Sequence, residues 1–92
     1  MFIIVNHNIR APEAFWRIVK EQLSELPARF TLHSLYPSVD RLRCFSIWDA
    51  ENTAALNEML RTCFGDFSRD ELIEINRDAA FGFLRNAHQS TN

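Results

Sequence analysis

Glycine and proline are scarce in this chain, whose 92 residues include only two glycines and three prolines. Because these residues mark turns and loops, we expect most of the chain to form regular secondary structure. Long apolar runs are missing as well, and no window approaches the roughly 18–20 apolar residues that span a bilayer. The hydrophobic content of 47% excludes disorder for most of the chain. The length suits one domain.

An excess of basic residues is also absent. Ten Lys and Arg residues stand against twelve Asp and Glu residues, a net charge of −2. Nucleic-acid binders carry a basic face, so we expect no nucleic-acid partner. The two cysteines, Cys44 and Cys63, lie far apart, whereas a small secreted disulfide scaffold has more. Residues 1–7 lack the charged region and cleavage site of a signal peptide. These features predict a soluble cytoplasmic protein with free thiols and no membrane contact.

Hydrophobic periodicity divides the chain into strands and helices. Strands are predicted at 2–9, 29–36, 41–49 and 71–76, and helices at 12–26 and from about residue 51 to 64. Pro12 suits a first helical turn, Pro27 ends that helix, and Gly65 suits the left-handed position after the second helix. A loop with Asp66, Ser68 and Asp70 is expected before the last strand, and residues 79–84 form an apolar extension.

The order β-α-β-β-α-β predicts an α+β fold of the ferredoxin-like type. In this sandwich both helices cover one face of a four-stranded antiparallel sheet. The expected strand order is fourth, first, third, second, so that the first and third strands lie at the centre. Residues 1–84 form the predicted domain, and residues 85–92 are predicted to be a flexible tail.

The predicted strands carry apolar residues on both faces. Alternation separates Ile3 and Val5 from Phe2 and Ile4, Phe30 and Leu32 from Leu35, and Phe45 and Ile47 from Leu42 and Trp48. Two helices can cover only one of these faces, and monomers rarely expose an apolar patch larger than a few hundred Å². We therefore expect a homodimer in which two copies pair through the open sheet faces.

The segment at residues 44–51, with the sequence CFSIWDAE, resembles the end of the third strand in the dimeric α/β-barrel superfamily. There a Trp precedes an acidic residue, a small residue and the second helix, and the element order over residues 1–78 is also similar. The superfamily includes antibiotic-biosynthesis-type monooxygenases, heme-degrading monooxygenases, muconolactone isomerases and families of unknown activity. The resemblance implies a dimeric protein that binds a small apolar or aromatic molecule between its sheet and helices. It also implies a cofactor-independent monooxygenase-like or isomerase-like enzyme, although this fold hosts several chemistries.

Cofactor signatures are missing from the chain. Asn6 could match the first-strand Asn of heme-degrading members, but residues 51–64 contain no His and no Trp. The heme ligand of those members is therefore absent. Gly65 and Gly82 are isolated, so no glycine-rich loop is available for phosphate. We expect no cofactor.

Polar and amphipathic residues near strand ends are the candidate ligand-binding residues: Asn6, Asn8, Tyr36, Ser46 and Trp48, together with Glu74 and Asn76. Small-molecule pockets are mostly apolar with a few placed polar groups, and the superfamily resemblance implies that Trp48 lines such a space. The alternative is that Trp48 fills the core with its N–H bonded, while the asparagines occupy wet strand ends.

His7 and His33 are the candidate metal ligands. They would lie two strand spacings apart, about 9.6 Å, which is too far for one ion within a chain. A site across the dimer interface stays open, as does a structural role for each histidine. Cys44 and Cys63 are expected to pack in the core rather than act as nucleophiles. No Ser-His-Asp pattern is visible in the sequence, although such groups need to converge only in space. The remaining alternatives are an enzyme, a non-catalytic ligand-binding or interaction module, and a metal-binding module.

Overall fold

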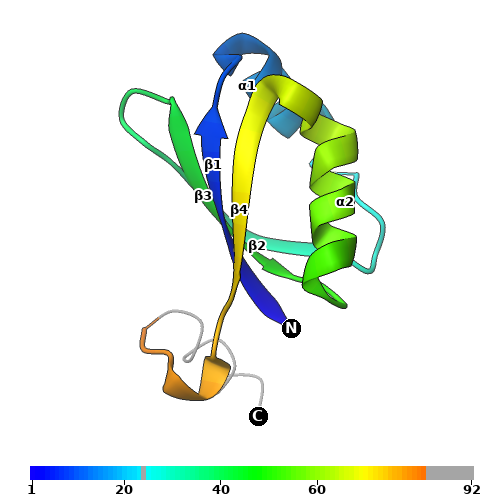
Figure 1. Cartoon of the computed structure of the whole chain (residues 1–92), viewed down its shortest axis with the longest axis vertical. Coiled ribbons are helices and arrows are strands. Elements are labelled where there is room, and N and C mark those ends of the chain that lie inside the picture. Colours follow the sequence, from blue (N-terminus) through cyan, green and yellow to red (C-terminus); the bar gives the residue numbers. More distant parts are fainter. Residues whose placement is uncertain (24, 83–92) are drawn as a thin grey trace.

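The computed structural model of this chain describes residues 1–23 and 25–82. Its elements are β1 (Phe2–Ile9), α1 (Pro12–Gln22), β2 (Thr31–Pro37), β3 (Arg43–Asp49), α2 (Thr53–Phe64), η1 (Gly65–Phe67), β4 (Ser68–Glu74) and η2 (Arg77–Ala79) (Figure 1). The predicted tail at 85–92 and the end of the apolar extension, residues 83–84, lie outside the described residues.

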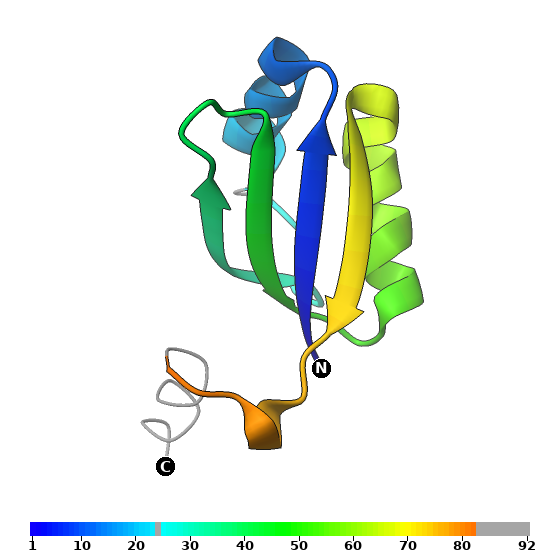
Figure 2. The same cartoon turned by 60° about the vertical axis from the view of Figure 1, so that its left-hand side comes forward.

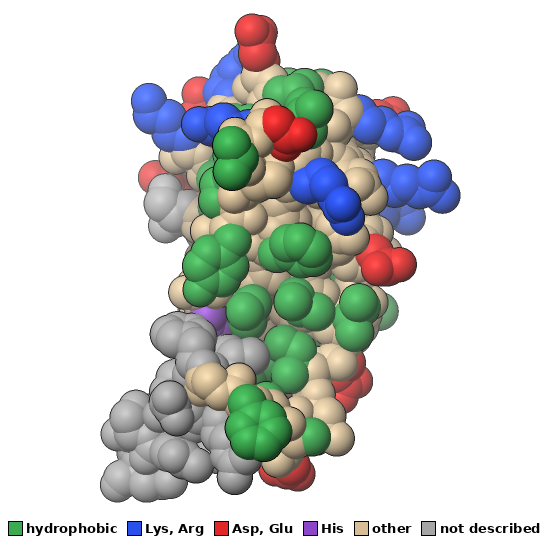
Figure 3. Space-filling view, turned by 90° about the vertical axis from the view of Figure 1, so that its left-hand side faces the viewer, with side chains coloured by type: hydrophobic (Ala, Val, Ile, Leu, Met, Phe, Trp, Pro, Cys, Tyr) green, Lys and Arg blue, Asp and Glu red, His purple; other side chains and the backbone are tan. Residues whose placement is uncertain are grey.

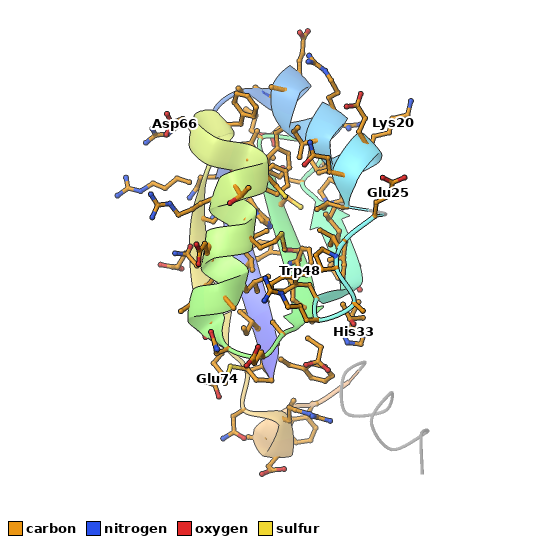
Figure 4. All side chains as sticks on the ribbon, turned by 90° about the vertical axis from the view of Figure 1, so that its right-hand side faces the viewer. Lys20, Glu25, His33, Trp48, Asp66 and Glu74 are labelled. Carbon is orange, nitrogen blue, oxygen red and sulfur yellow. The ribbon has the colours of Figure 1, made fainter. Side chains whose placement is uncertain are left out.

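The strands form one antiparallel sheet in the order β2-β3-β1-β4 (Figure 2). β1 and β3 therefore lie at the centre, where the element order places them. Both helices lie in front of the same face of the sheet, which leaves the other face open (Figure 4). This α+β arrangement is compatible with a ferredoxin-like sandwich. No helix among the described residues is long and apolar enough to cross a membrane.

The core lies between the sheet and the two helices. Its fully buried side chains include Ile3, Val5, Phe15, Trp48, Leu56 and Leu60. Phe15 of α1 stacks on Phe64 of α2, with 4.5 Å between the ring centroids. This aromatic pair joins the two helices above the central strands.

Local hydrogen bonds determine where the helices begin and end. α2 begins after Asn52, whose side-chain oxygen accepts the backbone N–H of Ala55 at 2.7 Å. It ends at Phe64, and the following Gly65 has a positive φ of 53°, a backbone conformation that favours glycine. α1 ends at Gln22, before the predicted boundary, because Glu25 donates its N–H to the Gln22 carbonyl in a tighter turn.

The second strand differs from its predicted alternation. The prediction that Leu32 and Leu35 face opposite sides is wrong, because the pairing register of β2 shifts between Leu32 and Ser34. Leu32 pairs with Trp48 and Leu35 pairs with Ser46, so both leucines pack against the core. Such a bulge adds one residue to a strand and reverses the alternation beyond it.

Residues 41 and 42, which were predicted to lie in β3, belong to the hairpin loop. That strand begins at Arg43 rather than at residue 41, and Leu42 lies outside it with 47% of its surface exposed. Arg41 has a positive φ of 62°, which ends the extended backbone at this point. Leu42 therefore does not share a strand face with Trp48.

The last strand begins earlier than predicted. β4 starts at Ser68, so the prediction of a loop at Ser68 and Asp70 is wrong. Ser68 pairs with Ile9, and Asp70 pairs with His7. Ser and Asp are common in turns, which explains the prediction. In the structure their side chains face the helices and form hydrogen bonds there, and this difference reveals the candidate site.

Candidate functional site

A group of polar side chains lies inside the apolar core, on the helix-facing side of the three strands β3, β1 and β4. His7 comes from β1, Ser46 and Trp48 come from β3, and Asp70 comes from β4. Trp48 and Ser46 are 0% exposed, and His7 is 1% exposed. Polar groups buried this deeply must find partners within the protein.

Four hydrogen bonds connect the group. His7 Nδ1 lies 2.8 Å from Asp70 Oδ1, and His7 Nε2 lies 2.7 Å from Ser46 Oγ. Trp48 Nε1 donates to Ser46 Oγ at 2.7 Å, and Ser68 Oγ donates to Asp70 Oδ1 at 2.8 Å. We call His7, Ser46, Trp48, Ser68 and Asp70 the buried polar network.

One arrangement of protons matches every donor of the buried polar network to an acceptor. Asp70, as a carboxylate, only accepts, so His7 donates through Nδ1–H. The other imidazole nitrogen, Nε2, then accepts the hydroxyl proton of Ser46. The oxygen of Ser46 accepts the N–H of Trp48, which can only donate. Each of these groups has a partner in this arrangement.

The order carboxylate, imidazole and hydroxyl is also the order of a nucleophilic triad. A nucleophilic serine must reach its substrate, but Ser46 is fully buried. The imidazole is enclosed as well, since the rings of Phe15 and Phe64 pack edge-on to His7 at 5.6 and 5.9 Å. The arrangement therefore links three strands and is closed to a substrate.

The five predicted ligand-binding residues separate between the two faces of the sheet. Ser46 and Trp48 come together in the buried polar network, whereas Asn6, Asn8 and Tyr36 belong to the open face. The partner roles of Ser68 and Asp70 were missed by sequence reasoning. Their alternation with Leu72 in one strand is the signal that could have found them.

Of the other two polar residues in that set, Glu74 ends β4, and Asn76 caps η2 by accepting the N–H groups of Asp78 and Ala79. Asn76 therefore has a local structural role.

The two candidate metal ligands do not approach one another. His7 faces the helices, and both of its ring nitrogens are engaged. His33 lies at the bulge of β2 and packs against the ring of Phe2, with 4.9 Å between centroids. Within residues 1–23 and 25–82 no cluster of three His, Cys, Asp or Glu side chains is placed to hold a metal ion.

Both cysteines are free thiols. Cys44 is fully buried in the core, and burial raises its pKa to about 11. Cys63 is half-buried beside Met59 on α2, and burial raises its pKa as well. Because the thiolate is the nucleophilic form, these shifts favour the predicted packing role over catalysis.

The open face carries a continuous set of apolar side chains. We call Ile4, Tyr36, Phe45, Ile47 and Ile73 the apolar band; they lie on two adjacent rows across the four strands. Tyr36, Phe45 and Ile73 expose 55%, 43% and 51% of their surface. Figure 3 shows apolar side chains gathered on the middle and lower parts of this face, below charged ones.

Two polar atoms at the apolar band lack partners. Asn6 Oδ1 and Ser34 Oγ are buried, and neither forms a hydrogen bond within the described part of the chain. Asn6 lies between Phe45 and Glu71, and Ser34 pairs with Ile47. Each unpaired buried polar atom carries a desolvation cost, so both atoms lower the stability of the folded chain.

Comparisons with protein-family models, with curated proteins and with solved structures give no match to this chain. The similarity to the dimeric α/β-barrel superfamily therefore rests on the element order and on the segment at residues 44–51. The geometry of the site is the remaining basis for a function.

Proposed function

We propose that this chain is a non-catalytic interaction module that forms a homodimer through its open sheet face, in the manner of a dimeric α/β barrel. The observation that carries the proposal is the apolar band, which the helices leave uncovered. Two-fold pairing brings one surface patch onto the same patch of a second copy. The band of each copy would then cover the band of the other.

The apolar band does not reach Phe2 at the beginning of β1. The ring of Phe2 is covered, because Arg77 lies over it at 4.4 Å and His33 packs on its edge. The face is thus covered at one end and open in its middle.

The burial of the core favours a module over the monooxygenase-like or isomerase-like enzyme. Trp48, which the superfamily resemblance would place beside a ligand, has no exposed surface and donates its N–H to Ser46. A metal site between two subunits is also less well supported than the interaction module. His7 points toward the helices and would not face the second copy across the open sheets.

Sedimentation velocity and light scattering at micromolar concentration test this proposal. We expect wild-type protein to have the mass of two chains and the Ile73→Glu variant to have the mass of one, because a buried carboxylate disrupts an apolar interface. Val39→Glu is the matched control, since Val39 is fully exposed in the hairpin loop, away from the apolar band.

The proposal fails if the wild-type protein has the mass of one chain. It also fails if Val39→Glu dissociates the dimer as completely as Ile73→Glu, since the effect would then come from added charge alone. Circular dichroism of both variants confirms that the mass is measured on folded protein.

A further inference from the structure

The polar residues of the open face lie at fixed places around the apolar band. One row across the sheet consists of directly paired residues of β2, β3, β1 and β4: Tyr36, Phe45, Asn6 and Glu71. The row beside it, at the hairpin end, holds Arg43, Asn8 and Arg69, and the row on its other side holds Ser34, Ile47, Ile4 and Ile73. β2 and β4 form the two edges of the sheet (Figure 2). The first row therefore has a phenol at one edge and a carboxylate at the other.

Glu71 is an acidic residue that a homodimer has to accommodate. It is exposed in the single chain, and its row contains two members of the apolar band. Neither Glu71 nor Tyr36 uses its side chain for a hydrogen bond or an ion pair within the described part of the chain. A carboxylate that loses its water in an interface needs a hydrogen-bond donor in exchange. The orientation of the second copy decides which side chain the carboxylate meets.

Two aligned sheets that pack face to face can be related by a two-fold axis along the strands or across them. An axis along the strands, at the centre of the sheet, exchanges the two edges, so that β4 of one copy lies over β2 of the other. Each row then faces its own counterpart. An axis across the strands lays β4 over β4 and reverses the order of the rows.

The axis along the strands gives the Glu71 carboxylate a donor. Glu71 then faces Tyr36 of the second copy, whose hydroxyl can donate a hydrogen bond. In the next row Arg43 faces Asn8 of the second copy, whose amide oxygen can accept from the guanidinium group. With the axis across the strands and the two bands overlapping, Glu71 instead faces Ile73. The carboxylate would then be desolvated against an aliphatic side chain, which is costly.

We propose that the two copies pair around an axis along the strands, with the Tyr36 hydroxyl on β2 of each copy donating to the Glu71 carboxylate on β4 of the other. This inference rests on the proposed homodimer and adds its orientation and the residue pair that specifies it. Two-fold symmetry forms the contact twice, once at each edge of the paired sheets. An apolar band flanked by two such contacts is selective for a second copy of this chain.

Isotope-filtered NOE spectra of a mixed dimer test the orientation. One copy carries ¹³C-labelled isoleucine methyl groups and the other is unlabelled. The chain has a single tyrosine, so an NOE from a labelled methyl group to a tyrosine ring identifies Tyr36 of the second copy. Within one chain Ile73 and Tyr36 lie three strand spacings apart, roughly 14 Å, so their contact can arise only between copies. We expect NOEs between the Ile73 methyl groups and the Tyr36 ring.

Substitutions at the two edges test the hydrogen bond. Tyr36→Phe keeps the ring and removes the donor, so the dissociation constant of the dimer should rise at least about tenfold in sedimentation experiments. Adding Glu71→Leu to Tyr36→Phe should restore most of the lost affinity, because the unpaired carboxylate is then gone. Glu58→Leu, at an exposed position of α2, is the matched control and should leave the dissociation constant unchanged.

The outcomes separate this inference from the homodimer itself. A wild-type mass of one chain overturns both. A mass of two chains overturns the orientation alone if Ile73 gives NOEs to β4 of the second copy instead of Tyr36. The same conclusion follows if Tyr36→Phe dimerises as tightly as wild type, or if the double variant stays as weak as Tyr36→Phe.

Discussion

Replacement of Ser46 by alanine is expected to destabilise the protein far more than a serine hydroxyl normally does. Ser46 Oγ forms hydrogen bonds of 2.7 Å with both His7 and Trp48 in the core. The substitution leaves an imidazole nitrogen and an indole N–H without partners. Each unpaired buried group costs about 1–3 kcal/mol, so the free energy of unfolding should fall by about 2–6 kcal/mol.

A second buried serine gives the matched control. Ser34 Oγ is buried without a hydrogen-bond partner, so Ser34→Ala removes a hydroxyl that already bears a desolvation cost. The free energy of unfolding of this variant should stay unchanged or rise by up to about 1 kcal/mol. The two substitutions are chemically identical, and only the hydrogen bonding of the hydroxyl differs.

Urea and thermal unfolding, followed by circular dichroism, measure both effects. All variants must be compared at one protein concentration, because self-association changes the apparent stability. For a domain of this size about 4–8 °C of melting temperature corresponds to 1 kcal/mol, so Ser46→Ala should melt about 10 °C lower or more. The reasoning is refuted if Ser46→Ala loses less than about 0.5 kcal/mol, or if Ser34→Ala loses as much as Ser46→Ala.

Two further predictions concern the reactivity of the buried groups. Because burial raises the pKa of Cys44 from 9.0 to about 11, the thiol contributes stability below pH 9 that is lost as the pH rises toward 11. Urea unfolding across this interval should show a decline that is shallower in Cys44→Ala. Ser46 should form no adduct with a fluorophosphonate probe in the folded protein, as judged by intact mass; an adduct would show that the buried polar network opens to reagents.

Much of the fold could be predicted because helices and turns are specified by local chemistry. The spacing of Leu56, Leu60 and Phe64 predicts the buried side of α2, and Gly65 marks its end. The order of elements then limits the sheet to few topologies. The boundaries of β2 and β4 were less predictable, because a bulge and a hydrogen-bonded Asp70 depend on contacts with other strands.

The candidate site was predicted only in part. Alternation along β3 places Ser46 and Trp48 on one side, and alternation along β1 places Asn6 opposite to His7. Sequence alone does not say which side the helices cover, because Ile3 and Ile4 make both sides of β1 apolar. The contact of His7 with Asp70 also spans 63 residues, and no local pattern encodes such a separation.

The buried polar network explains how a sheet that is apolar on both faces keeps one register. When only one face of a strand is apolar, a slip of one residue exposes the core, and hydrophobic burial specifies the pairing. On β1 such a slip would exchange Ile3 for Ile4 at little cost in apolar area. It would also move His7 away from Ser46 and Asp70, leaving buried polar groups unpaired. Polar groups, rather than apolar area, thus distinguish the helix-covered face from the open one.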